Sequence, residues 1–120
     1  MPLQSYPELR VWRAAFDLAV DSHRLAGRPP PTERYALGAQ IRRASASVPA
    51  SIAEGYWRSQ RGDYLRHLSV AAGSLKELET HLPLARALDY IDSTTTDPLL
   101  RGAASVGRML TRLQRSLRAQ

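Results

Sequence analysis

The sequence contains no cysteine, and only one of its 17 basic residues is a lysine. Without cysteine there is no disulfide framework, no thiolate nucleophile and no cysteine-ligated zinc or iron–sulfur site. No hydrophobic run reaches the ~20 residues that a membrane-spanning helix needs. The N-terminal stretch MPLQSYPELR also lacks the basic-then-apolar pattern of a secretory signal. We therefore expect a cytoplasmic protein that does not enter a membrane.

Acidic side chains are missing from the C-terminal part of the chain. The formal net charge is +6, and the segment from Pro98 onward contributes most of it. Arginine favours bidentate contacts with phosphate groups, although a GC-rich genome would produce the same bias without any function. The basic residues of this segment are Arg101, Arg108, Arg112, Arg115 and Arg118.

No stretch alternates apolar and polar residues, so the sequence predicts no strands and an all-α fold. The length of 120 residues suits about one domain, and we expect residues 1–120 to form it. Helical spacing of apolar residues predicts four helices with short connections, which favours an antiparallel up-down four-helix bundle. The expected helices span approximately residues 7–26, 33–60, 63–88 and 98–118.

Glycine, aspartate and proline set the expected helix ends. Gly62 suits the position that follows the second helix, and Asp63 suits the N-cap of the third. Asp97 and Pro98 form an N-cap followed by a proline at the first helical position, which predicts the start of the fourth helix.

Pro49 lies inside the second expected helix, where a proline costs about 3 kcal/mol. The apolar spacing nevertheless continues from Val48 to Ile52 without a change of phase. This pattern predicts one kinked helix instead of two helices. The carbonyl of Ser45, which the proline deprives of its usual donor, would need a hydroxyl from Ser45 itself, a neighbouring helix or water.

A strip of alanines lies on the face of the second helix opposite its large apolar residues. A helix with such a second face can accept another close helix there, which suggests a subunit contact. Alanine is also the best helix former, so the strip could simply face water. We expect Trp57 at the same interface. The strip consists of Ala39, Ala46, Ala50 and Ala53.

The arginines of the last expected helix lie within a sector of about 60° opposite its leucines. No acid interleaves this arginine stripe, so it is either a solvated outer face or a surface for a polyanion such as nucleic acid. The arginine stripe consists of Arg101, Arg108, Arg112 and Arg115. Further candidate nucleic-acid contacts on the second helix are Arg42, Arg43, Arg58 and Arg61.

Two glutamates are candidates for a structural polar network. Glu54 and Arg58 are four residues apart, so they form either an exposed helix pair or part of a network at a helix contact. Glu79 falls on the inward side of the third helix, where it would need Arg42 or Arg43 as a partner.

Signatures of catalysis are absent from the sequence. There is no glycine-rich phosphate loop, nucleophile elbow or HExxH, and neither Glu54 nor Glu77 begins the Glu-x-x-His of a di-metal bundle. We expect no enzyme activity, no metal and no cofactor.

The sequence resembles bacterial four-helix bundle proteins related to the 23S rRNA intervening-sequence protein. The accessory variability determinant of diversity-generating retroelements is similar to the same group. The resemblance lies in YPELRVWRAAFDLA (6–19), ERYALGAQIRRASASVPASIAEGYWR (33–58), YLRHLSVAAGSLKELETHL (64–82) and ALDYI (87–91). It implies a bundle that assembles as a ring of five copies, a role in binding nucleic acid and no catalysis.

By position, the resemblance carries the family's charged residues over to Arg42, Arg43, Glu54, Arg58, Glu77 and Glu79. The chain departs from the family at Ser51, where asparagine is common, and at Pro83, where a proline is unusual. We expect a homopentamer that binds RNA or DNA, as an accessory to a nucleic-acid enzyme such as a reverse transcriptase. The alternative is a protein–protein interaction scaffold of the same fold that binds no nucleic acid.

Overall fold

The computed structural model describes residues 7–26 and 33–120, and these residues form helices and short connections without any strand. The all-α prediction is therefore confirmed for the described part of the chain. The helices are α1 (Pro7–Ala26), α2 (Glu33–Tyr56), α3 (Arg61–Ala87) and α4 (Ser93–Arg118).

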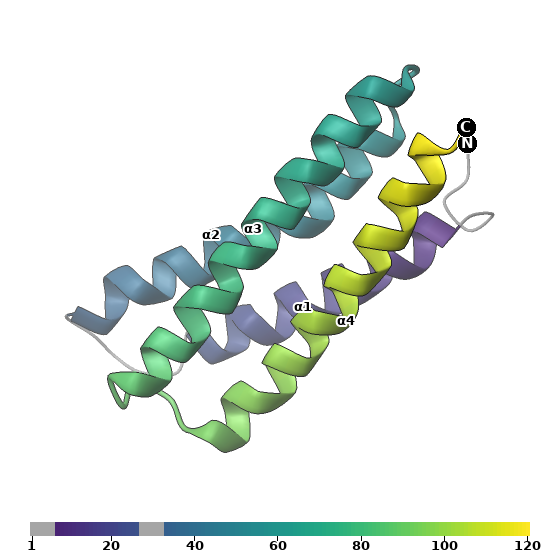
Figure 1. Ribbon diagram of the computed structural model, residues 1–120. Helices are drawn as coiled ribbons and strands as arrows, with labels where there is room; N and C mark the ends of the chain where they lie inside the picture. The colour runs from purple at the N-terminus through teal and green to yellow at the C-terminus, as the bar shows by residue number, and fades with distance from the viewer. Residues whose placement is uncertain (1–6, 27–32) are drawn as a thin grey trace.

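Each helix packs against two others around the bundle (Figure 1). α2 lies between α1 and α3, and α4 closes the bundle by packing on α3 and α1, while the diagonal pairs make no close approach. Successive helices run in opposite directions (Figure 1), which gives an elongated molecule of 46 × 21 × 21 Å. The α1–α2 face and the α3–α4 face consequently lie on opposite sides of the bundle.

The core consists of the apolar stripes that the sequence predicts. On α2, Ile41, Val48 and Ile52 are almost completely buried, and on α4 Val106 and Leu110 are. Burying one such side chain contributes about 1.5–3 kcal/mol, which explains why these stripes face one another. Leu88 is an exception because α3 ends one residue before it, and it is 49% exposed.

Pro49 does not divide α2, which runs without interruption through it. Val48 and Ile52 on either side are fully buried, and this packing compensates for the missing backbone hydrogen bond. The hydroxyl of Ser45 donates to the carbonyl of Arg42 at 3.1 Å, and so is directed to a different carbonyl from the one that the proline frees. α3 likewise continues through Pro83.

The connection between α2 and α3 is longer than the sequence indicates. α2 ends at Tyr56, so the prediction that it extends to residue 60 is wrong. Gly62 does not follow α2 but lies in the first turn of α3. The N-cap of α3 is Gln60 and not Asp63, which is an acidic residue of the first turn. The turn closes through a hydrogen bond from Arg58 N to Gly55 O at 3.1 Å, which leaves four residues to join two antiparallel helices.

α4 begins five residues before the position that Asp97 and Pro98 indicate. Its N-cap is Asp92, whose carboxylate accepts hydrogen bonds from Thr95 N at 3.0 Å and from the Thr94 hydroxyl at 2.7 Å. These hydrogen bonds lower the pKa of Asp92, because they stabilise its charged form. The threonines at positions 94–96 therefore form the first helical turn, and Pro98 lies inside the helix.

Candidate nucleic-acid interface

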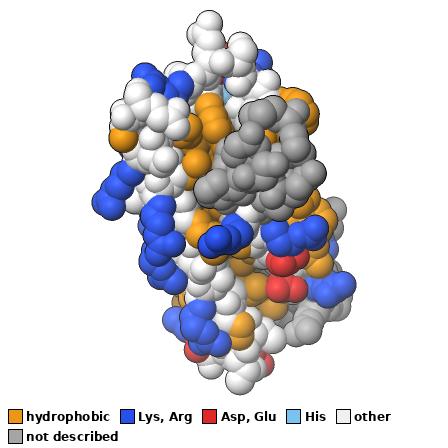
Figure 2. All heavy atoms as spheres, turned by 90° about the vertical axis from the view of Figure 1, so that its right-hand side faces the viewer, with side chains coloured by type: hydrophobic (Ala, Val, Ile, Leu, Met, Phe, Trp, Pro, Cys, Tyr) orange, Lys and Arg blue, Asp and Glu red, His pale blue; other side chains and the backbone are white. Residues whose placement is uncertain are grey.

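The arginine stripe lies along the exposed side of α4, and all four of its side chains are exposed. Among the described residues, no carboxylate lies within ion-pair distance of any of the four. Figure 2 views the molecule from the right-hand side of Figure 1, where α4 lies, and shows more basic than acidic side chains. The stripe is thus an uncompensated cationic surface.

Three residues of the stripe border a groove between α3 and α4, which we call the charged groove. It has a volume of about 450 Å³. From Arg108 to Arg115 the stripe follows the groove for about 10 Å of helix axis. Arg101 lies one heptad earlier on α4 and does not line it. The lining residues are Ala72, Leu75, Lys76, Glu79, Ala104, Gly107, Arg108, Leu110, Thr111, Arg112, Gln114 and Arg115.

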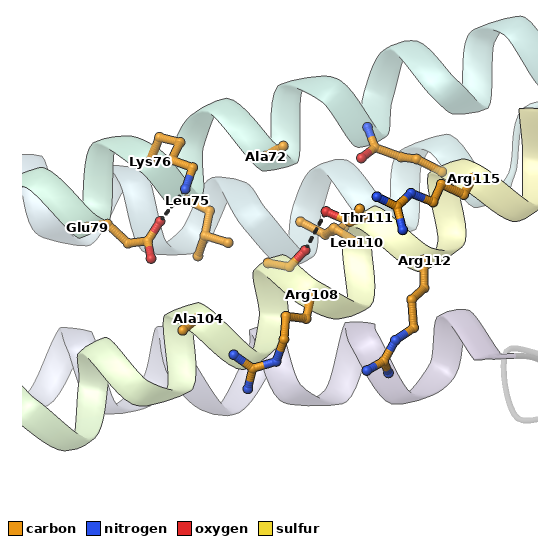
Figure 3. Close-up of a pocket in the computed structure, with 12 residues that line it drawn as sticks. Ala72, Leu75, Lys76, Glu79, Ala104, Arg108, Leu110, Thr111, Arg112 and Arg115 are labelled. Atoms are coloured by element: carbon orange, nitrogen blue, oxygen red, sulfur yellow. Dashed lines mark hydrogen bonds and ion pairs between the residues drawn. The ribbon is translucent and has the colours of Figure 1, made fainter.

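The two ends of the charged groove carry different charges. Figure 3 shows Lys76 and Glu79 on α3 at one end and Arg115 on α4 at the other. Arg108 and Arg112 extend from the side of α4 that faces away from α3 in this view. All three arginines nevertheless line the groove on its α4 side, and Glu79 on its α3 side is the single carboxylate among the lining residues.

The predicted pairing of Glu79 with Arg42 or Arg43 is wrong. Its Oε1 atom lies 3.2 Å from Nζ of Lys76, one turn earlier on the same helix. The side of α3 that carries Glu79 faces α4 across the groove, whereas both arginines belong to α2 on another side of α3. The Glu79 side chain is 25% exposed and so lies at the edge of the interior, not within it.

Glu54 joins α2 to α3 at the surface. One of its oxygens lies 3.7 Å from Arg58 and 3.7 Å from Nε2 of His67 on α3. The other ring nitrogen of His67 lies 2.8 Å from the carbonyl oxygen of Asp63. Because Glu54 is 62% exposed, the Glu54–Arg58 pair contributes only about 0.2–0.5 kcal/mol.

The arginines predicted on α2 and beyond it do not join the stripe. Arg42 is half-buried and Arg43 is exposed on α2, which lies diagonally opposite α4. Arg58 follows the end of α2. Arg61 donates to the backbone carbonyl of Gln120, which holds the start of α3 beside the end of α4. The predicted cationic residues thus occupy separate places on the molecule.

The alanine strip borders a second groove, on the α1–α2 face, which we call the apolar groove. Its volume is about 580 Å³. Ala46 and Ala50 are exposed. Ala39, about two turns earlier on α2, is also exposed but does not line the groove, and Trp57, which follows the end of α2, is 65% exposed. The lining residues are Trp12, Phe16, Ala19, Val20, His23, Arg24, Ala46, Pro49, Ala50 and Ala53.

Aromatic side chains of α1 form one wall of the apolar groove. Trp12 and Phe16 stack with ring centroids 5.1 Å apart, and Phe16 is 40% exposed. The guanidinium of Arg13 lies 5.4 Å from the centre of the Trp12 ring. Trp12 is half-buried, and its ring borders the groove because α1 has no other helix on that side.

Gly55, within the IAEG motif, is a structural residue whose role the sequence reasoning missed. A Cβ atom at this position would lie 2.7 Å from Cβ of His67 and 2.9 Å from Cδ1 of Tyr64. α2 and α3 approach each other there too closely for any side chain. The sequence signal that could have indicated this close approach is a glycine near the end of a helix with regular apolar spacing.

The described residues form neither a metal site nor a membrane-spanning helix. Residues 7–26 and 33–120 contain no group of three histidine, aspartate or glutamate side chains arranged to hold a metal ion. Within the same ranges, none of the helices is both long and apolar enough to span a lipid bilayer.

Comparisons with known proteins find one family and a solved structure of similar fold. The family described as "23S rRNA-intervening sequence protein" matches residues 7–112. A crystal structure from Bacteroides thetaiotaomicron, described as a protein with unknown function from the S23 ribosomal protein family, is similar to this chain with a TM-score of 0.84. That match covers 92% of this chain and 99% of the other at 19% sequence identity, a level that shows the shared fold. Comparison with curated proteins finds no match.

Proposed function

The chain belongs to the 23S rRNA-intervening sequence protein family, and from that premise we propose that it is a non-enzymatic, homo-oligomeric protein that binds RNA or DNA. Binding takes place through arginine-rich helix faces, chiefly the arginine stripe of α4. The protein acts as an accessory to a nucleic-acid enzyme such as a reverse transcriptase. The observation that carries the proposal is the exposed stripe without a carboxylate partner among the described residues.

The physical basis is the release of counterions from a phosphate backbone. If all four arginines of the stripe neutralise a phosphate of duplex DNA, the logarithm of the binding constant falls with that of the salt concentration with a slope of about −3.6. Between 50 and 200 mM salt, this slope corresponds to an affinity loss of roughly 100-fold. Such contacts involve no base, so binding has little sequence preference.

The apolar groove supports the homo-oligomeric part of the proposal. Its alanines let a second helix approach closely, and its exposed aromatic rings would be buried by a second copy of the chain. We propose a closed ring, with five copies as the number that the family resemblance suggests. Because the α1–α2 face is opposite the α3–α4 face, such a contact leaves the arginine stripe accessible.

The test is binding to a structured RNA and to duplex DNA over a salt series, compared between two charge-reversed variants. Arg108→Glu with Arg112→Glu changes the stripe, while Arg66→Glu with Arg86→Glu makes the same charge change at exposed positions on α3 that line neither groove. We expect micromolar or tighter binding by the parent chain, a loss of at least 100-fold in the stripe variant, and a much smaller loss in the control. No binding at low salt, or equal losses in the two variants, would reject the proposal.

A protein–protein interaction scaffold is the second candidate function, and the apolar groove favours it. An exposed groove with aromatic walls is typical of a protein contact, which does not require nucleic acid. If the scaffold function is the correct one, reversing all four charges of the arginine stripe leaves capture of the partner protein intact. Loss of capture together with loss of nucleic-acid binding would contradict it.

A further inference from the structure

The charged groove differs from the rest of the arginine face because it is hollow and has an apolar floor. Leu75 and Leu110 are almost completely buried beneath it. Ala104 and Gly107 leave space above them, since neither has a side chain long enough to fill the gap between α3 and α4. A surface that held a phosphate backbone by charge alone would need no such recess.

The size and chemistry of the recess suit the bases of a nucleic acid, which a duplex keeps in its interior. A volume of about 450 Å³ is within the range of small-molecule clefts, roughly 300–1,000 Å³. A duplex stacks its bases in its interior and presents its backbone outward, so it can reach Arg108 and Arg112 on the rim but places no base on the floor. An unpaired strand can turn its bases outward onto apolar surface while its phosphates contact arginines.

Glu79 gives the recess a group that can distinguish bases. One of its oxygens is engaged by Lys76, and Figure 3 shows the other directed to the α4 side of the groove. A carboxylate accepts hydrogen bonds from the exocyclic amino groups of adenine, cytosine and guanine. Uracil and thymine present a carbonyl oxygen in place of that amino group, which a carboxylate repels.

We propose that the charged groove binds a short unpaired segment of RNA or DNA. The phosphates contact Arg108, Arg112 and Arg115, and the sugars and base faces lie over Leu75 and Gly107. The amino group of one base donates to Glu79, so bases with an amino group are preferred over uracil or thymine. This inference rests on the proposed function and adds to it the strand type and the base preference.

The first experiment fills the recess without changing its charge. Fluorescence anisotropy compares a single-stranded RNA with a duplex of the same length, for the parent chain and for Ala104→Trp. The matched control is Thr80→Trp, at an exposed position of α3 outside the groove. We expect Ala104→Trp to lose at least tenfold affinity for the single strand and less than threefold for the duplex, because the rim arginines remain.

The outcomes separate this inference from the proposed function. If the parent chain binds neither probe at low salt, the proposed function fails. If the parent binds but Ala104→Trp leaves single-strand affinity unchanged, or lowers both affinities equally, only the groove assignment is overturned. Should circular dichroism show that Ala104→Trp does not fold, Thr111→Trp fills the same groove from an exposed position of α4 and the same criteria apply.

The second experiment tests the base preference. Oligocytidine and oligouridine have bases of the same ring size, and we expect the parent chain to bind the former about three- to tenfold more tightly. Glu79→Gln should reduce this ratio toward one, because its amide both donates and accepts. Glu77→Gln removes the same charge at an exposed position outside the groove and should keep the ratio. Equal binding of both oligomers by the parent, or an unchanged ratio in Glu79→Gln, would overturn the role of Glu79.

Discussion

The apolar groove and the charged groove lie on opposite faces of one bundle and are built in the same way. In each, small residues on two neighbouring helices leave a recess, Ala19 and Ala50 in the first and Ala72 and Gly107 in the second. The rims differ, because aromatic rings border the apolar groove and guanidinium groups border the charged groove. Helix packing therefore provides the shape of both grooves, while a few long side chains determine which class of partner each one suits.

The largest effect is expected from a charge placed in the apolar groove. Ala50→Glu would bury an unpaired carboxylate if a second copy covers this groove, at a cost of several kcal/mol. We expect the oligomer to dissociate to the 13.3 kDa chain, as measured by light scattering. Ala87→Glu, at an exposed position at the end of α3, is the control and should keep the assembled mass. An assembled mass in Ala50→Glu would show that the apolar groove is not the contact.

A second prediction concerns the helix contact that holds the two faces in register. Gly55→Ala forces a Cβ atom against His67 and Tyr64, so we expect a loss of about 1–3 kcal/mol in the free energy of unfolding. Gly73→Ala is the matched control, because nothing lies within 4 Å of its added Cβ. It should be neutral or stabilising by up to about 1 kcal/mol, since alanine is the better helix former. Urea unfolding measures both, and equal effects would contradict the close approach of α2 and α3.

A smaller effect on stability is expected from a substitution at the end of α3. Asp89 has a positive φ of 61° and follows the C-cap Leu88, and Tyr90 N donates to Ala85 O at 2.9 Å, as in a Schellman motif. Asp89→Gly relieves the left-handed conformation, and we expect it to stabilise the fold by about 0.5–1.5 kcal/mol. Thermal unfolding measures the change, and a destabilised variant would contradict the assignment.

The smallest expected effect is a pH dependence at the start of α4. Hydrogen bonds lower the pKa of Asp92, so its contribution to stability is complete above the ordinary value of 3.8 and is lost as the pH falls through the lower folded value. Asp92→Asn keeps a capping oxygen but does not titrate. The difference in melting temperature between parent and variant should therefore shrink as the pH falls below 3.8. A difference that grows on acidification would contradict the role of the charged cap.

Apolar periodicity predicted the helices themselves, because four long amphipathic segments with short connections leave few other arrangements. The predicted start of α4 was wrong because Asp97 and Pro98 form a pattern that is typical of a helix start. The N-cap in the structure is Asp92, which accepts a hydrogen bond from Thr95 N. The arginine stripe was visible on a helical wheel, since it needs only one helix.

Neither groove could be predicted from one helix alone, unlike the arginine stripe. The charged groove depends on small residues from α3 and α4 facing each other, and no single segment contains that information. Glu79 illustrates the limit, because its helical position indicated the interior, yet its partner Lys76 lies on the same helix and both line the groove. The alanine strip was recognised on α2, but the aromatic wall on α1 could be assigned only once the helices were paired.

The proposed function requires that two opposite faces of the bundle act separately, one in assembly and one in binding nucleic acid. The most direct test is light scattering of the parent chain alone and with a structured RNA at low salt. Without RNA, we predict an assembly with a mass several times that of the 13.3 kDa chain. With RNA, we predict a complex that contains the same number of protein chains. A 13.3 kDa species that assembles only when RNA is added, or an assembled protein that binds no RNA, would contradict the account.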